Sequence, residues 1–122
     1  MARFLIDGPD LVLRLSWSER VGGVHGDVRV PLSAVRSVTA VPKPWLALRG
    51  WRMAGVSIPG SLALGTRRHG SGYDFTAVYK QRPAVQVELN TGRFERIVAS
   101  VAGDVEVESE ADRIAGAAGI GR

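Results

Sequence analysis

The sequence predicts a mainly β protein, a single domain over residues 1–122. We expect about seven short antiparallel strands followed by one C-terminal helix. Apolar and polar residues alternate with a period of two along most of the chain, which is typical of half-buried strands. Turns rich in glycine and proline separate these segments. Such strands would leave open edges unless they curl into a barrel or sandwich, and one amphipathic helix could cover the open end.

The first strands are predicted within residues 10–18 and 26–41. One face of "DLVLRLSWS" (10–18) is apolar and consists of Leu11, Leu13, Leu15 and Trp17. The glycines of "ERVGGVHG" (19–26) predict a hairpin connection. Pro31 divides 26–41 into two strands, because proline fixes its own φ and donates no backbone hydrogen bond.

The segment 42–60 is predicted as a long connection between two sheets, with "RGWRMAGVSIPG" (49–60) as its hinge. Glycines there supply conformations that other residues resist, and prolines stiffen the path. Trp45 and Trp51 are large apolar side chains, and aromatic residues at such a position usually fill the open end of a barrel. We therefore predict Trp45 and Trp51 as interface residues.

The remaining strands bring the predicted strand region to about residues 3–101. Their segments are 61–66, 73–80, 84–90 and 94–101. The turn "RRHGSG" (67–72) and the turn "QRP" (81–83) should lie at opposite ends of the strand 73–80. "NTGR" (90–93) predicts a tight hairpin, because asparagine and glycine tolerate positive φ.

Residues 103–119 change to helical spacing, and the helix is predicted over about 104–118. Asp104 is the predicted N-cap, and Gly119 is the predicted stop. Acidic residues in the first turn suit the positive end of a helix. The string "VEVE" (105–108) could instead extend as a strand, in which case the helix would begin nearer Ser109.

Composition narrows the classes of function. The chain has no cysteine, so disulfides, thiolate chemistry and zinc sites that need sulfur are excluded. The N-terminal "MARFLIDGPD" has no apolar run long enough for a signal peptide or a membrane span. We therefore expect a cytoplasmic protein, with a peripheral place at an anionic membrane surface as the alternative.

The net charge of +4 is unevenly distributed along the chain. Residues 43–93 hold eight basic and two acidic side chains, whereas residues 94–122 hold three basic and six acidic ones. A basic central region is suited to an anionic partner such as a phosphate, a lipid headgroup or a nucleic acid. The competing interpretation is a solvated, arginine-rich surface.

No pattern in the sequence predicts an enzyme. His25 and His69 each lie in a glycine-flanked turn, without the spacing that forms a metal site. No serine lies in a G-x-S-x-G elbow, and neither the Walker pattern nor G-x-G-x-x-G is present. We predict no catalytic residues, no metal and no cofactor.

The most specific site hypothesis is an anion-binding patch at Arg67, Arg68 and His69, which Arg49 and Arg52 could join. Adjacent cationic side chains on a loop can grip a phosphate or an acidic partner. The alternative is a plain solvated turn. Nucleic acid ranks below protein as a partner, because the aromatic residues do not alternate with basic ones along one strand face.

Two stretches carry a family resemblance: "VRVPLSAVRSV" (28–38), a strand, a corner and a strand, and "GYDFTAVYKQRPAVQVELNTGRFERIVASV" (72–101), three strands before the helix. This order resembles the pleckstrin-homology-like (PH-like) fold and is most similar to small bacterial PH-like proteins. The resemblance implies a bent seven-stranded antiparallel barrel or sandwich with one C-terminal α-helix. Lipid-binding members carry basic residues around their first hairpin, where this chain offers only Arg20 and His25.

These observations predict a non-enzymatic PH-like module for binding or assembly. Its expected role is protein–protein contact, either with another protein or by self-association, because exposed strand edges often pair across symmetric interfaces. The alternative is a module that binds an anion or lipid headgroup through the basic turn at Arg67 and Arg68.

Overall fold

A computed structural model of the chain describes residues 2–23, 25–70 and 72–121. Over these residues the backbone forms nine β-strands in two sheets, two α-helices and two short 3-10 helices. The strands are β1 (Arg3–Asp7), β2 (Asp10–Arg14), β3 (Val28–Pro31), β4 (Val35–Val41), β5 (Trp51–Ile58), β6 (Leu62–His69), β7 (Gly72–Tyr79), β8 (Ala84–Leu89) and β9 (Phe94–Ser100). The helices are α1 (Trp17–Gly23), η1 (Leu32–Ala34), η2 (Pro44–Ala47) and α2 (Val107–Ala118).

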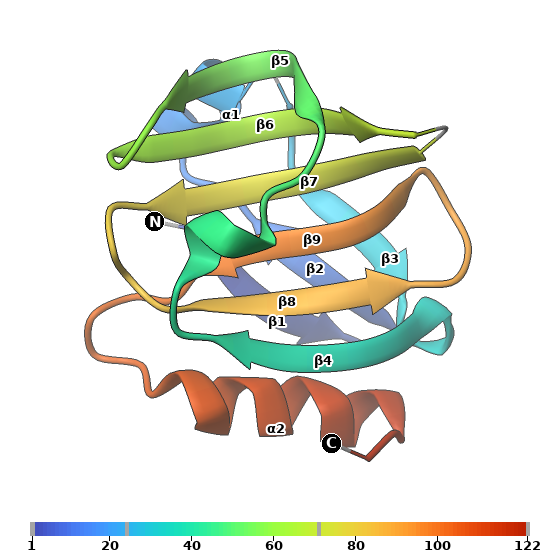
Figure 1. The fold of residues 1–122 in the computed structure, drawn as a ribbon. Coiled ribbons are helices and arrows are strands. Elements are labelled where there is room, and N and C mark those ends of the chain that lie inside the picture. The colour runs from blue at the N-terminus through green and yellow to red at the C-terminus, as the bar shows by residue number, and fades with distance from the viewer. Residues whose placement is uncertain (1, 24, 71, 122) are drawn as a thin grey trace.

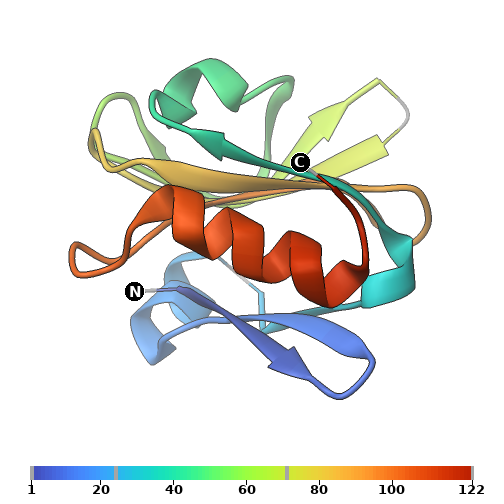
Figure 2. The same cartoon turned by 90° about the horizontal axis from the view of Figure 1, so that it is seen from below.

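The two sheets face each other across the core (Figure 1). The smaller sheet has the strand order β1-β2-β3, and the larger has the order β4-β8-β9-β7-β6-β5. Helix α2 runs along the opening between the sheets on the side of β4 (Figure 2). Helix α1 lies at the opposite side, against β5 and β6 (Figure 1).

The larger sheet contains one parallel pair, β7 with β9. The chain leaves β7, turns past the end of β9 and returns as β8, so β9 inserts between the two. The turn is tied to β9, because Ser100 Oγ accepts from Tyr79 N at 3.1 Å and donates to the Arg82 carbonyl at 3.3 Å. Val101 N also donates to the Pro83 carbonyl at 3.0 Å.

The predicted mainly β architecture with one C-terminal helix is confirmed. The predicted set of seven all-antiparallel strands is wrong for the described residues, because β1 and β5 add two strands and β7 pairs parallel with β9. β1 lacks a clear alternation of apolar and polar residues. β5 occupies eight residues of the predicted connection 42–60, and its internal glycine concealed it.

Helix α1 replaces part of the predicted hairpin 19–26, of which residue 24 lies outside the described residues. Its start is a capping box formed by Ser16 and Glu19. Ser16 N donates to Glu19 Oε1 at 2.8 Å, and Glu19 N donates to Ser16 Oγ at 3.3 Å. The predicted strand 10–18 therefore ends at Arg14, where the helix-capping signal overrides the alternating pattern.

Glu19 also joins α1 to both sheets. Its side chain is buried, and its Oε2 accepts from Ala2 N at 2.8 Å and from the Tyr79 hydroxyl. Burial raises the pKa of Glu19, but the hydrogen bonds from Tyr79 and Ser16 outweigh it and leave the pKa lowered. Burial and the bond to Glu19 raise the pKa of Tyr79, so its phenol remains a donor.

The core lies between the two sheets and extends under α2. Its largest fully buried apolar side chains include Phe75, Leu11, Leu13, Ile97 and Ile114. Helix α2 begins at Val107, since Glu106, and not the predicted Asp104, accepts from Glu108 N and Ser109 N. Gly119 ends the helix in the left-handed conformation with φ 72°, as predicted.

A pair of glycines lets β5 approach β6 closely. Gly55 and Gly65 are cross-strand partners with φ 105° and 117°. A Cβ on Gly65 would lie 2.2 Å from the Ala54 carbonyl oxygen, and a Cβ on Gly55 would lie 2.0 Å from that of Leu64. Gly23 at the end of α1 packs on the same spot, so a side chain here would separate three elements.

We predict that Gly65→Ala lowers the free energy of unfolding by more than about 3 kcal/mol, because both its φ and its backbone neighbours exclude a Cβ. Gly116→Ala is the matched control. Gly116 lies in the interior of α2 with open space around it, so alanine there should stabilise the protein by about 0.5–1 kcal/mol. Urea unfolding of both variants measures the difference, and equal effects would contradict the close approach.

Candidate functional site

The outer face of the larger sheet carries an ion pair whose carboxylate is buried. Asp74 on β7 is only 1% exposed, and its two oxygens accept from Arg49 Nε at 2.6 Å and Arg49 Nη2 at 2.9 Å. The hydrogen bond to Asp74 raises the pKa of Arg49. Arg67 donates to the carbonyls of Arg49 at 3.2 Å and Gly50 at 3.1 Å. The hydrogen bonds of Arg49 and Arg67 therefore hold residues 49–50, which precede β5, against the sheet.

A second ion-pair network lies beside the first. Glu88 accepts from Arg36 Nη2 at 2.5 Å and from Arg96 Nη2 at 2.8 Å, and these bonds leave its pKa lowered. Arg96 Nη1 also donates to the Ala47 carbonyl at 3.1 Å. Much of the arginine content on this face thus holds η2 and its flanking chain against the sheet.

The predicted patch Arg67, Arg68 and His69 does not converge. These residues end β6, and the predicted turn 67–72 is shorter than expected, with residue 71 outside the described residues. Successive strand residues project to opposite faces, so Arg67 and Arg68 point apart. Arg68 stacks on the Tyr73 ring at 5.6 Å and donates to its hydroxyl at 3.3 Å, while His69 is exposed. Arg52, on β5, donates to the Gly55 carbonyl at 3.1 Å.

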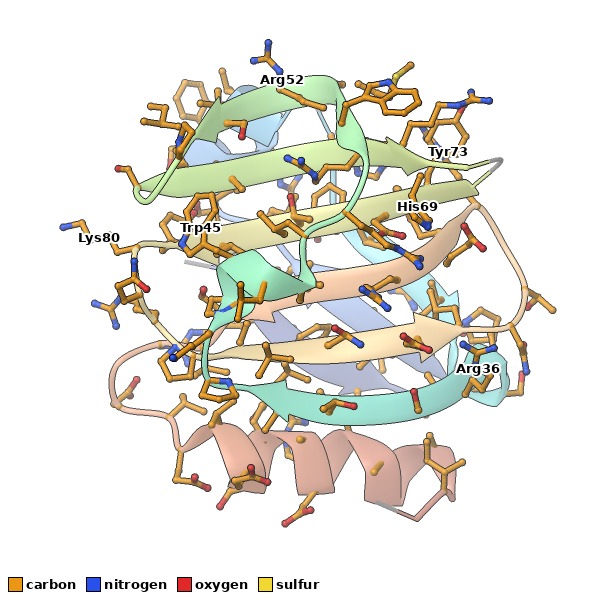
Figure 3. All side chains as sticks on the ribbon, viewed as in Figure 1. Arg36, Trp45, Arg52, His69, Tyr73 and Lys80 are labelled. Carbon is orange, nitrogen blue, oxygen red and sulfur yellow. The ribbon has the colours of Figure 1, made fainter. Side chains whose placement is uncertain are left out.

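The two predicted interface tryptophans lie in different environments. Trp45 packs on the outer face of the larger sheet with Ala63, Val78, Ala84 and Val98, and its Nε1 donates to the Lys80 carbonyl at 2.5 Å. It covers the sheet face and does not plug a barrel mouth (Figure 3). Trp51, at the start of β5, is 59% exposed.

The strand β5 forms an uncovered edge of the larger sheet (Figure 1). It has eight residues and pairs only with β6, with a bulge next to Arg52. Its large apolar side chains Trp51, Met53 and Ile58 are exposed, and Arg52 is its only charged residue. A long apolar edge with little charge is a template for pairing with another strand. No pattern in the sequence predicted this edge, because β5 lies within the predicted connection 42–60.

The two histidines lie in different environments. The ring of His25 packs between Phe75 at 5.1 Å and Phe94 at 5.6 Å, so it belongs to an aromatic cluster and is not a free turn residue. Within residues 2–23, 25–70 and 72–121 no three metal-ligating side chains gather in one place. No helix in the same ranges is long and apolar enough to cross a membrane.

Comparison with protein-family models, curated proteins and solved structures finds no match to this chain.

We predict that Asp74→Asn lowers the free energy of unfolding by about 2 kcal/mol, because it leaves the guanidinium of Arg49 without its carboxylate at a largely buried position. Arg29→Gln serves as the control. Arg29 also bridges carboxylates, those of Asp7 and Asp10, but it is exposed and its loss should leave the melting temperature close to that of the wild type. A similar loss in both variants would contradict a structural role for the Arg49–Asp74 pair.

Proposed function

We propose that this chain is a non-enzymatic, PH-like assembly module that pairs with a second copy of itself through β5. The observation that carries the proposal is the exposed β5 edge, which is eight residues long, apolar and nearly free of charge. Proteins usually shield such edges with charges, prolines, bulges or covering segments, and β5 has one charge and one bulge, both near its start. A partner strand would satisfy the backbone groups of the edge and cover its side chains.

The sequence of β5 is self-complementary in a two-fold antiparallel pairing. In such a pairing the two ends of the strand meet, so Trp51 of one copy approaches Ile58 of the other. Arg52 lies near one end of the strand, so the two Arg52 side chains lie near opposite ends of the ladder. Apolar pairs meet and like charges do not, which favours a copy of this chain over a partner of unrelated sequence.

The PH-like assignment rests on the pattern of strand, corner and strand, on the later strands and on the C-terminal helix that covers an open side of the sandwich. The parallel β7–β9 pair is a local departure from a simple meander. The alternative, an anion site at Arg67 and Arg68, has less support. Arg67 is engaged by two backbone carbonyls, and Arg68 points to the other face of β6.

We predict that the wild-type protein is a dimer in size-exclusion chromatography with light scattering, at both low and high salt, because the interface is apolar and backbone-mediated. The double variant Met53→Lys/Ile58→Lys should elute as a folded monomer, since four lysines would then line the paired edges.

The matched control is Leu46→Lys, which places a lysine at another highly exposed apolar residue, in η2 and away from the edge. This variant should remain a dimer. A wild-type monomer at all concentrations, or a dimer that persists in the double variant, would refute pairing through β5.

A further inference from the structure

A polar groove opens at the end of the larger sheet where β7 turns toward β8. Its volume is about 470 Å³, and Ser16, Ser18, Ser61, Leu62, Tyr79, Lys80 and Arg82 line it. The lining offers hydroxyl groups and two cations, and it contains no carboxylate. Figure 3 shows Lys80 at the opposite end of the sheet from His69 and Tyr73, so this groove is separate from the predicted Arg67–His69 patch.

The backbone holds Lys80 in a strained conformation. Its φ is 46°, the only positive φ at a non-glycine residue among the described residues. Its N donates to the Ser61 carbonyl at 2.8 Å, and its carbonyl accepts from Trp45 Nε1 at 2.5 Å. A non-glycine residue in this region is energetically costly and persists only where the surroundings fix it. The fold therefore places a lysine at the groove where a glycine would be less strained.

A second groove meets the first at one residue, Ser16. It has a volume of about 340 Å³ and is lined by Arg3, Leu5, Arg14, Leu15 and Ser16. Arg3 on β1 and Arg14 on β2 are direct cross-strand partners. Like charges in this position repel each other.

Asp7 and Asp27 line a neighbouring groove with Arg14, but the ion pairs of the described residues join these carboxylates to other arginines. Arg29 on the same sheet bridges Asp7 at 2.8 Å and Asp10 at 2.9 Å, whereas Arg3 and Arg14 have no ion pair within the described part of the chain. Lys80 and Arg82 likewise have no ion pair within the described part of the chain. The nearby Glu19 carboxylate is buried and accepts bonds from Ala2, Ser16 and Tyr79, so it faces inward.

We propose that the two joined grooves form one binding site for a phosphate-bearing anion. Lys80 and Arg82 hold the phosphate from one side of Ser16, and Arg3 and Arg14 hold it from the other. Serine hydroxyls supply further hydrogen bonds, and charge-assisted bonds of this kind are the strong ones. The bound anion would offset the repulsion between Arg3 and Arg14. The site is independent of β5 and does not rest on self-association.

The phosphate could belong to a soluble phosphate ester or to a phospholipid headgroup. Trp17 is 78% exposed and follows Ser16 in the chain, and Leu5 in the second groove is also exposed. An amphipathic tryptophan beside cationic residues is common at membrane surfaces. Both sources present the same group to the four cations, and the experiment separates them.

The test titrates inorganic phosphate into the full-length protein at low salt and follows backbone amide shifts in the NMR spectrum. We expect shifts at residues 16–18, 61 and 80–82, and at least a roughly tenfold weaker affinity in both Lys80→Gln/Arg82→Gln and Arg3→Gln/Arg14→Gln. The matched control Lys43→Gln/Arg93→Gln removes the same charge elsewhere and should stay within about twofold of the wild type. Arg3→Gln/Arg14→Gln should also melt no lower than the wild type without phosphate, which shows that it folds.

A flotation assay with phosphatidylcholine vesicles, with and without phosphatidic acid, distinguishes the two sources. Flotation that needs phosphatidic acid, Trp17 and the four cations identifies a headgroup. Phosphate binding without flotation identifies a soluble ester. The proposal is overturned if phosphate shifts none of these amides and the vesicles do not bind, or if the control variant loses as much affinity as the groove variants. Met53→Lys alone should bind phosphate as the wild type does, because Met53 does not line the groove, so the two proposals fail separately.

Discussion

The rest of the structure depends on the buried carboxylate of Glu19, which binds groups from three separate segments of the chain. It completes the capping box that starts α1, and it binds Ala2 before β1 and the hydroxyl of Tyr79 on β7. One side chain therefore connects the helix with both sheets. A buried carboxylate is costly unless donors surround it, and here each donor comes from a different element. Closure of the sandwich at this end and the position of α1 follow from that requirement.

Both proposed sites lie next to this junction. The end of α1 packs on Gly65, where β6 and β5 approach closely. The helix therefore supports β5 from the inner side, while the edge of β5 that faces away from β6 remains open. Ser16 and Tyr79, which bind Glu19, also line the groove that holds Lys80 and Arg82. The outer face of the sheet is different, since its arginines serve to hold η2 and the chain that leads into β5.

The sequence predicted the elements whose signals are local. The strands around 73–80, 84–90 and 94–101 and the stop at Gly119 follow from alternation, turns and caps, and the structure has them within a few residues. The residues of the capping box are present in "SWSE" (16–19). The alternating pattern of residues 10–18 overlaps them and predicted a strand where the helix begins. The parallel β7–β9 pair and the Arg49–Asp74 bond depend on contacts between distant residues, which no local pattern contains. Arg67 was predicted to bind an anion. No local pattern shows that its guanidinium instead binds two backbone carbonyls of the chain before β5.

The most direct test of the central claim is amide hydrogen exchange of β5 (Trp51–Ile58) measured across a range of protein concentrations. Pairing of two copies predicts that outward-facing β5 amides become more protected as the concentration rises, because each gains a partner carbonyl. Amides of β3, an edge strand of the smaller sheet, should exchange at the same rate throughout and serve as the internal reference. Exchange in β5 that is rapid and independent of concentration would contradict an assembly role for this edge.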